Sequence, residues 1–361
     1  MILFLEFQRL GQRGGEQYHR KLHAFLSDRF SDVLPQELGP PPDNVRTRWQ
    51  LLKHCVRLID QHKPSLVVTD LSSAMLSYFA LRCVRRYGGS VLLVAQGDRL
   101  PFSRRGRLFK LIARHMEKQC IRRADVAVVN SSYTAGLLQK RRTESLPFVI
   151  GYPGPGSGSE IGATPVDYSV NESPRLLYVG ECSRVKGLIY LVEALSLLPD
   201  EVILDIAGGS DQEPDYFEGV KNLIDQRDLS GRIRIHGYVS GGKLASLYQQ
   251  ASILVVPSLS EGYGMVLVEG LRHGLPVVAS RVGAIPEIIT HNANGLLVPP
   301  AEPQALADAI AGLINDTEAL QIMARENRRT AGNLPTWSDF DAVLDDELLP
   351  LLTPLLKKSH P

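Results

Sequence analysis

Two acidic side chains, Glu261 and Glu269, lie on either side of a glycine turn within residues 257–287. The turn is Gly262–Gly264, and a helical run begins at Met265. The first N–H groups of a helix lack intrahelical partners, and the helix dipole places about half a positive charge there, so this turn attracts a phosphate or another anion. The two acids are eight positions apart, slightly more than two helical turns. Glu269 can therefore point back toward Glu261.

The flanking residues predict the elements that position this turn. Ile253–Val256 is a short apolar strand that ends before Pro257, and Pro276–Ser280 is the next buried strand. Together they predict a βαβ unit of a parallel sheet. The acids also fit a simpler role, because acidic residues are common near helix starts and Glu269 could be a solvated helix residue.

A second turn carries basic side chains. Arg184 and Lys186 follow the predicted strand Arg175–Gly180 and precede the helix that begins at Leu188. Cations at a helix start oppose the helix dipole, so an anion bound there would explain them better than helix stability does. Surface cations also occur at helix starts, and that alternative stays open.

The run Pro257–Glu287 resembles the donor-site signature of retaining glycosyltransferases of family 4. In that signature a Pro-Ser…Glu-Gly-Tyr/Phe-Gly turn is followed by a second Glu, with seven residues between the two acids. The similarity continues through Gly274–Ala279, Gly283–Ile289 and Asn294–Pro300. It is dense over residues 174–330 and present only in outline before them.

The resemblance implies an α/β protein of GT-B architecture, in which two Rossmann-like domains face each other across a cleft and a C-terminal helix crosses back to the first domain. We expect a first domain over residues 1–158, on the acceptor side, and a linker over 159–173 that follows the Gly- and Pro-rich run at residues 151–159. The donor domain follows over 174–335, and 336–361 forms a helical segment that packs back on the first domain, with Trp337 near the crossing.

The resemblance also implies roles for single residues. Glu261 would contact hydroxyls of the donor sugar, Glu269 would bind the ribose, and Lys186 and Arg184 would neutralise the diphosphate. The usual Arg position, directly after Gly180, is Glu181 here. Further nucleotide-sugar contacts are expected around the glycine turns and beside the base, at Gly14, Gly15, Gly180, Tyr238, Val239, Gly262, Tyr263, Gly264 and Met265. His236 is expected to be structural.

Gln96 follows a predicted strand in the first half, where many relatives carry a His near the transferred sugar. Glutamine can hydrogen-bond a sugar or acceptor hydroxyl, but it does not titrate near neutral pH. Asp98 is a candidate substitute, although an ordinary turn aspartate fits equally well.

The net charge of +1 is the sum of a basic first part and an acidic second part of the chain. Residues 1–150 hold 25 Lys and Arg against 12 Asp and Glu, whereas residues 151–361 hold 15 against 27. Nine of these cations lie in residues 99–123, where apolar residues recur at roughly helical spacing. A basic amphipathic helix suits an anionic membrane surface, but an ordinary helix with a solvated basic face fits as well. No aromatic stacking platform accompanies the charge, so nucleic acid is not expected.

The sequence therefore predicts a retaining, metal-independent glycosyltransferase of the hexosyltransferase type. It would move a sugar from a UDP- or GDP-type donor to a hydroxyl of a saccharide or lipid-linked acceptor, without a further cofactor. The alternative is a catalytically impaired nucleotide-sugar binding protein that acts as a scaffold or regulator. No apolar run approaches the length of a membrane span, so we expect a cytoplasmic protein, with peripheral contact to the inner membrane face as a further option. The four cysteines lack Cys-x-x-Cys spacing and predict reduced, buried thiols.

Overall fold

The chain folds into two compact units in the computed structural model. Unit 1 comprises Met1–Pro153 and Thr336–Pro361, and unit 2 comprises Gly154–Pro335. The structure describes residues 1–6, 14–37, 45–71, 74–97, 107–141, 146–156 and 173–357. Asp98, residues 99–106 of the basic stretch and all of the predicted linker but its last residue lie outside the described residues.

Unit 1 contains a parallel six-stranded sheet in the order β2-β1-β3-β4-β5-β6. Its strands are β1 (Ile2–Glu6), β2 (Val33–Glu37), β3 (Leu66–Asp70), β4 (Ser90–Ala95), β5 (Val126–Val129) and β6 (Phe148–Ile150). The helices that connect them are α1 (Gly14–Arg29), α2 (Val45–His62), α3 (Ala74–Val84) with η2 (Arg85–Tyr87), α4 (Arg107–Arg123) and α5 (Ser132–Lys140). This is the repeated βα pattern of a Rossmann-like domain.

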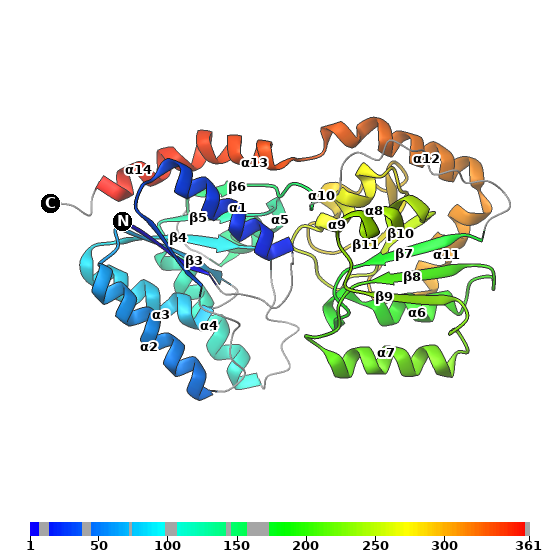
Figure 1. Cartoon of the computed structure of the whole chain (residues 1–361), viewed down its shortest axis with the longest axis horizontal. Helices are drawn as coiled ribbons and strands as arrows, with labels where there is room; N and C mark the ends of the chain where they lie inside the picture. Colours follow the sequence, from blue (N-terminus) through cyan, green and yellow to red (C-terminus); the bar gives the residue numbers. More distant parts are fainter. Residues whose placement is uncertain are drawn as a thin grey trace. The chain divides into compact units, whose positions relative to one another are not determined.

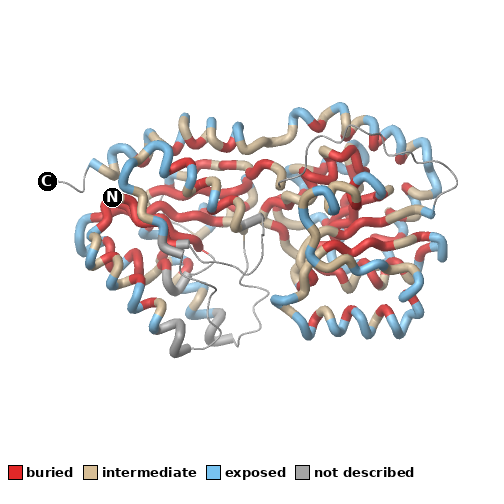
Figure 2. Tube along the Cα trace, viewed as in Figure 1, coloured by how far each residue is buried: buried red, intermediate tan, exposed pale blue. Residues whose placement is uncertain are grey.

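Successive side chains along each strand of unit 1 enter different cores, as strand geometry requires. Leu3 and Leu5 pack with α2, α3 and α4, whereas Ile2 and Phe4 pack on the opposite face with α1. The C-terminal helices α13 (Trp337–Val343), η6 (Leu344–Leu348) and α14 (Leu349–Lys357) join α1 on that face (Figures 1 and 2). The C-terminal segment is therefore part of the core of unit 1.

Specific contacts fix the C-terminal helices to α1. The Phe340 ring packs edge-on against Tyr18, with 5.1 Å between ring centroids. Arg29 donates two hydrogen bonds to the carboxylate of Asp345. Trp337 contacts Phe340 and lies under the ammonium group of Lys21. The predicted return of the final helix to the first domain is thus confirmed.

Unit 2 contains a second parallel six-stranded sheet, in the order β12-β11-β10-β7-β8-β9. Its strands are β7 (Arg175–Val179), β8 (Ile203–Ala207), β9 (Ile233–Gly237), β10 (Ile253–Val256), β11 (Val277–Ser280) and β12 (Gly295–Val298). Its helical segments are η4 (Arg184–Lys186), α6 (Leu188–Leu195), α7 (Pro214–Gln226), α8 (Gly241–Gln250), α9 (Met265–Arg272), α10 (Ile285–Ile288), α11 (Pro303–Asn315), α12 (Thr317–Thr330) and η5 (Ala331–Asn333).

The strand order reverses once in each sheet. In unit 1 the chain builds outward in both directions from the neighbouring strands β1 and β3, and in unit 2 it does so from β7 and β10. At such a switch point the connecting loops diverge, leaving a crevice at the carboxyl ends of the strands where open α/β sheets bind ligands. The predicted βαβ unit, β10-α9-β11, is confirmed and begins at the switch point of unit 2.

Candidate functional site

Lys186 and Glu261 meet at the switch point of unit 2. Lys186 ends η4, which follows β7, and Glu261 follows β10. The Lys186 ammonium nitrogen lies 2.6 Å from Glu261 Oε2, so the two side chains form a charge-assisted hydrogen bond. Seventy-five residues separate them in the sequence. The strand order alone brings them together.

Close backbone packing fixes the loop that carries Lys186. Gly187 has a φ of +69°, and a Cβ at this position would lie 2.1 Å from the carbonyl oxygen of Pro257. In addition, Leu259 N–H donates a 2.8 Å hydrogen bond to the carbonyl oxygen of Val185. Only glycine fits at position 187, and the two loops are held together by their main chains.

The backbone of Glu261 is held from its other side. Its carbonyl oxygen accepts a 3.0 Å hydrogen bond from Ala284 N–H. At Gly283, with a φ of +55°, an added Cβ would lie 1.9 Å from the same carbonyl oxygen. Gly264 adopts a φ of +97° and is the N-cap of α9. The main chain thus holds Glu261 rigidly just before the start of α9, and the N–H groups at a helix start attract anions.

Glu269 lies inside α9 and is only 7% exposed. Its Oε1 accepts a 3.0 Å hydrogen bond from Gly156 N–H, and its Oε2 accepts a 2.8 Å hydrogen bond from the Tyr248 hydroxyl. Burial raises the pKa of this carboxyl group, and the two hydrogen bonds only partly offset that effect. Glu269 is therefore a buried, oriented hydrogen-bond acceptor, and the alternative of a solvated helix residue is wrong.

Tyr248 and His273 complete the surroundings of Glu269. Their rings stack with 4.9 Å between centroids and an interplanar angle of 7°. Burial, together with the nearby carboxylate, raises the pKa of Tyr248 well above its ordinary value, so its hydroxyl stays protonated and donates. Neither residue is predicted from the sequence, because Tyr248 lies on α8, which shows only an ordinary helical pattern, and His273 is a single residue at the end of α9.

The comparisons with known proteins bear on this unit directly. Residues 167–330 match the family model described as glycosyl transferases group 1. Unit 2 belongs to the glycosyl transferases group 1 family. Over 175 residues the chain is 32% identical to a D-inositol 3-phosphate glycosyltransferase from Xylanimonas cellulosilytica, a match that covers 48% of this chain and 42% of that protein. In eight of the curated relatives, the matched stretch spans 37% to 60% of the relative's own length.

Two solved structures resemble the whole chain. HepE from Anabaena, in complex with UDP and glucose, is 20% identical, with a TM-score of 0.74 over 96% of this chain and 99% of that one. A sucrose-phosphate synthase from Thermosynechococcus elongatus is 19% identical, with a TM-score of 0.81 over 98% and 99%. The predicted GT-B fold with two Rossmann-like units is thereby confirmed.

Arg184 points elsewhere within the group 1 unit. Its Nε lies 3.4 Å from Glu213 Oε2, and its guanidinium group lies over the ring of Tyr216. Arg184 lies on η4 like Lys186, but its side chain pairs with Glu213, the N-cap residue of α7. In this structure the predicted cationic pair is split between two acidic partners.

Other predicted contacts of the group 1 unit lie at the same edge of the sheet. Gly180 follows β7 with a φ of +150°, and a Cβ on Gly208 would lie 1.7 Å from the Gly180 carbonyl oxygen. Tyr238 and Val239 follow β9, and Tyr238 is 56% exposed. Tyr263 is buried, whereas Gly262 and Met265 are partly exposed.

His236 belongs to a group of three side chains that connects neighbouring strands. Its Nε2 lies 2.7 Å from Asp205 Oδ1, and Arg175 donates to the other oxygen of the same carboxylate. Asp205 is buried in β8, so the three side chains brace neighbouring strands. This agrees with the structural role expected for His236.

The predicted residues of the first half lie in unit 1. Gly14 and Gly15 are the first residues of α1, and Gln96 directly follows β4 and is partly exposed. The basic stretch contributes α4, on which Leu111 and Ile112 are 63% and 48% exposed. At the opposite side of this helix Cys120 and Ile121 enter the core.

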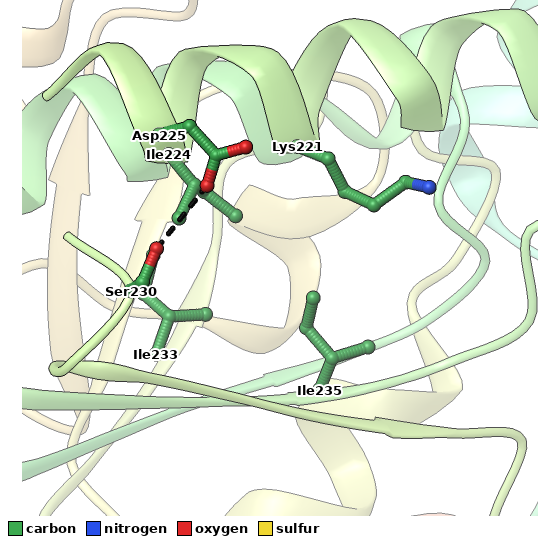
Figure 3. Close-up of a pocket in the computed structure, with 6 residues that line it drawn as sticks. All are labelled: Lys221, Ile224, Asp225, Ser230, Ile233 and Ile235. Carbon is green, nitrogen blue, oxygen red and sulfur yellow. Dashed lines mark hydrogen bonds between the residues drawn. The ribbon is translucent and has the colours of Figure 1, made fainter. Parts of the chain in front are cut away.

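A shallow pocket between α7 and β9 contains none of the predicted residues (Figure 3). It is lined by Lys221, Ile224, Asp225, Ser230, Ile233 and Ile235. Ser230 precedes β9, so the pocket lies toward the amino ends of the strands, away from the glycine turns. Within the described ranges there is no cluster of three metal-ligating side chains, and no helix there is long and apolar enough to span a membrane.

Proposed function

We propose that the chain is a glycosyltransferase that takes a sugar from a UDP- or GDP-type donor and transfers it to a hydroxyl group. The observation that carries the proposal is the contact between Lys186 and Glu261 beside the start of α9. An ammonium group and unpaired helix N–H groups suit a diphosphate, and the adjacent carboxylate suits sugar hydroxyls. The membership of unit 2 in the group 1 family supports the same reading.

Negative charge develops on the diphosphate as the glycosidic bond breaks. In this proposal Lys186 and the N–H groups at the start of α9 stabilise that charge, an effect that is typically worth about 3 kcal/mol for a single donor. Positive charge held by the chain performs this task without a divalent metal. Glu269 would bind the ribose, for which its buried carboxylate is already oriented by Tyr248.

We further propose that the anomeric configuration is retained. The acceptor would attack from the face that the diphosphate leaves, and a phosphate oxygen would take its proton. Glu261 is hydrogen-bonded to Lys186, which suits a role in binding better than nucleophilic attack. A trapped glycosyl-enzyme intermediate on Glu261 would overturn this mechanism.

The acceptor is proposed to be a saccharide or a lipid-linked sugar. The relative named D-inositol 3-phosphate glycosyltransferase and the HepE complex with UDP and glucose support a sugar or polyol substrate class. The exposed Leu111 and Ile112, on a helix that also carries Arg114, Lys118 and Arg122, support contact with an anionic membrane surface. Sedimentation with anionic vesicles at low salt tests this contact, and absence of binding would remove it.

The donor site is tested by thermal unfolding with UDP, GDP, ADP and their sugars. A ligand that binds only the native state stabilises it by RT ln(1 + [L]/Kd), about 2.7 kcal/mol at a hundredfold excess over Kd. We expect one nucleotide to raise the Tm of the wild type and to lose this effect in Lys186→Ala and Glu269→Ala. Lys221→Ala, a surface lysine paired with Glu218, is the matched control.

Product analysis separates the two readings of the sequence. Transfer or slow hydrolysis of the stabilising sugar nucleotide is expected, with the released sugar first appearing in the anomeric form of the donor. Nucleotide binding without any release of sugar would favour the binding protein or scaffold instead. If no nucleotide in the panel raises the Tm, the proposed donor site is wrong.

A further inference from the structure

A second pair of titratable side chains lies at the switch point of unit 1. His19, on the second turn of α1, follows the connection from β1, and Asp70 is the last residue of β3. His19 Nε2 lies 2.5 Å from Asp70 Oδ2. Strands β1 and β3 are the neighbours between which the strand order reverses. The pair therefore occupies in unit 1 the topological place that Lys186 and Glu261 occupy in unit 2.

Both side chains are buried and held in place. His19 is 8% exposed and Asp70 is 5% exposed. The Phe4 ring packs edge-on against the imidazole ring, with 6.3 Å between centroids. The Ser77 hydroxyl donates a 2.7 Å hydrogen bond to the carbonyl oxygen of Asp70, which fixes the end of β3. The pair is thus preorganised by neighbours on β1 and α3.

One atom of this pair is left without a partner. His19 Nδ1 is buried and makes no hydrogen bond in the described part of the chain. Because Asp70 accepts the hydrogen of Nε2, the neutral ring carries its lone pair on Nδ1. A buried unpaired acceptor is costly, and a buried polar pair is seldom more stable than well-packed apolar residues, so fold stability does not account for the arrangement.

The chemistry of the pair selects its ligand. The carboxylate of Asp70 disfavours an anion beside His19. The described residues offer no third ligating group with which the pair could hold a metal ion. A hydroxyl group can donate to Nδ1 while remaining uncharged. A polyol or sugar hydroxyl fits this position best.

We propose that His19 binds a hydroxyl group of a sugar or polyol through Nδ1, and that Asp70 is its positioning residue. That this hydroxyl belongs to the glycosyl acceptor rests on the proposed function. Gln96 supports the location, because it follows β4, the strand next to β3, at the same edge of the sheet.

The test is imidazole ¹⁵N NMR of the wild-type protein, titrated separately with myo-inositol, glucose and glycerol. At least one of these polyols is expected to shift the Nδ1 resonance of His19 and to leave His23 unshifted. Asp70→Asn is expected to weaken the binding of that polyol about tenfold, because the His19 ring loses the charge-assisted hydrogen bond that orients it. His23→Asn, a histidine one turn further along α1, should bind the polyol like the wild type.

If none of the three polyols moves the His19 resonance, the inference is overturned. If Asp70→Asn binds the polyol with the same affinity as the wild type, Asp70 is not a positioning residue. The nucleotide panel, run on the same sample, keeps the two proposals apart. A polyol shift without nucleotide binding would uphold the hydroxyl site and remove the donor site, whereas nucleotide binding without any polyol shift would remove the hydroxyl site alone.

Discussion

The Tyr248 hydroxyl donates a 2.8 Å hydrogen bond to Glu269 inside unit 2, joining helices α8 and α9 through a carboxylate that is almost fully buried. Glu269 also accepts from Gly156 N–H. A buried carboxylate with two directed donors has one preferred orientation. Its hydrogen-bonding geometry is therefore set before any ligand binds.

Tyr248→Phe removes one donor from Glu269 and leaves the packing of the ring unchanged. We expect the free energy of unfolding to fall by about 1–3 kcal/mol, because a buried charged group loses a hydrogen bond. Nucleotide affinity should fall as well, because the carboxylate is less firmly oriented. Urea denaturation and nucleotide titration measure the two effects. Tyr190→Phe, on α6, is the control and should leave nucleotide affinity unchanged.

The raised pKa of Glu269 predicts a pH dependence of stability. The folded state binds the proton of this carboxyl group more tightly than the unfolded state does, so the group lowers stability as pH rises from the ordinary pKa of 4.5 through the folded pKa. Glu269→Gln removes this dependence, although it also loses one accepted hydrogen bond at every pH. The stability of Glu269→Gln relative to the wild type should therefore rise with pH above 4.5. Denaturation series across this range measure it, and a constant difference would contradict the prediction.

Gly283→Ala should disturb the backbone of Glu261. The added Cβ would lie 1.9 Å from the Glu261 carbonyl oxygen, at a residue whose φ of +55° disfavours side chains. We expect a loss of about 1–3 kcal/mol in unfolding free energy together with weaker nucleotide binding. Gly219→Ala, in α7, meets no atom within 4 Å and should instead gain about 0.4–1 kcal/mol.

Arg184 and Lys186 should differ in their effects on nucleotide binding. Lys186 lies against Glu261, whereas Arg184 pairs with Glu213. Lys186→Ala is expected to weaken binding of the stabilising nucleotide about tenfold or more, equivalent to about 1.4 kcal/mol. Arg184→Ala should have a clearly smaller effect, and Glu213→Ala should not weaken binding. Equal losses for the two cations would show that Arg184 leaves Glu213 to reach the diphosphate.

Phe340→Ala tests the C-terminal helices as part of unit 1. The Phe340 side chain is fully buried against Tyr18 and Trp337. Its removal leaves a cavity and should cost about 3–5 kcal/mol of unfolding free energy. Ile322→Ala, on the exposed side of α12, should change it by less than about 0.5 kcal/mol. Denaturation followed by one probe in unit 1 and one in unit 2 measures Phe340→Ala and Ile322→Ala, respectively.

The fold of unit 2 around Glu261 and Glu269 could be predicted because its signals are local. An apolar strand that ends before Pro257, a glycine turn and a helix start define β10 and α9 within a few residues. The pairing of Lys186 with Glu261 could not be predicted, because it depends on β7 and β10 being neighbours in the sheet. This contact results from the order of the strands in the sheet, which no short sequence pattern encodes.

The residues missed by sequence reasoning share one property. Tyr248 and His19 each lie on an ordinary helix, and each acts through a partner on another element. A tyrosine or histidine on the buried face of a helix has no spacing that reveals such a partner. Arg184 shows the converse case, because a correct local pattern did not reveal that Glu213 would pair with its side chain.

The core of unit 1 is closed by residues from the far end of the chain. Phe340, Leu344, Leu348 and Leu352 pack against Tyr18, Leu22 and Phe25 of α1. During synthesis, α1 emerges from the ribosome long before these helices, and the part of its surface that they cover stays exposed until all of unit 2 has been translated. Unit 2 holds its strands and cores in one continuous stretch, so it can complete its fold earlier. A nascent chain stalled before Thr336 would therefore expose the part of the unit 1 core that these helices cover, and chaperones could bind that surface.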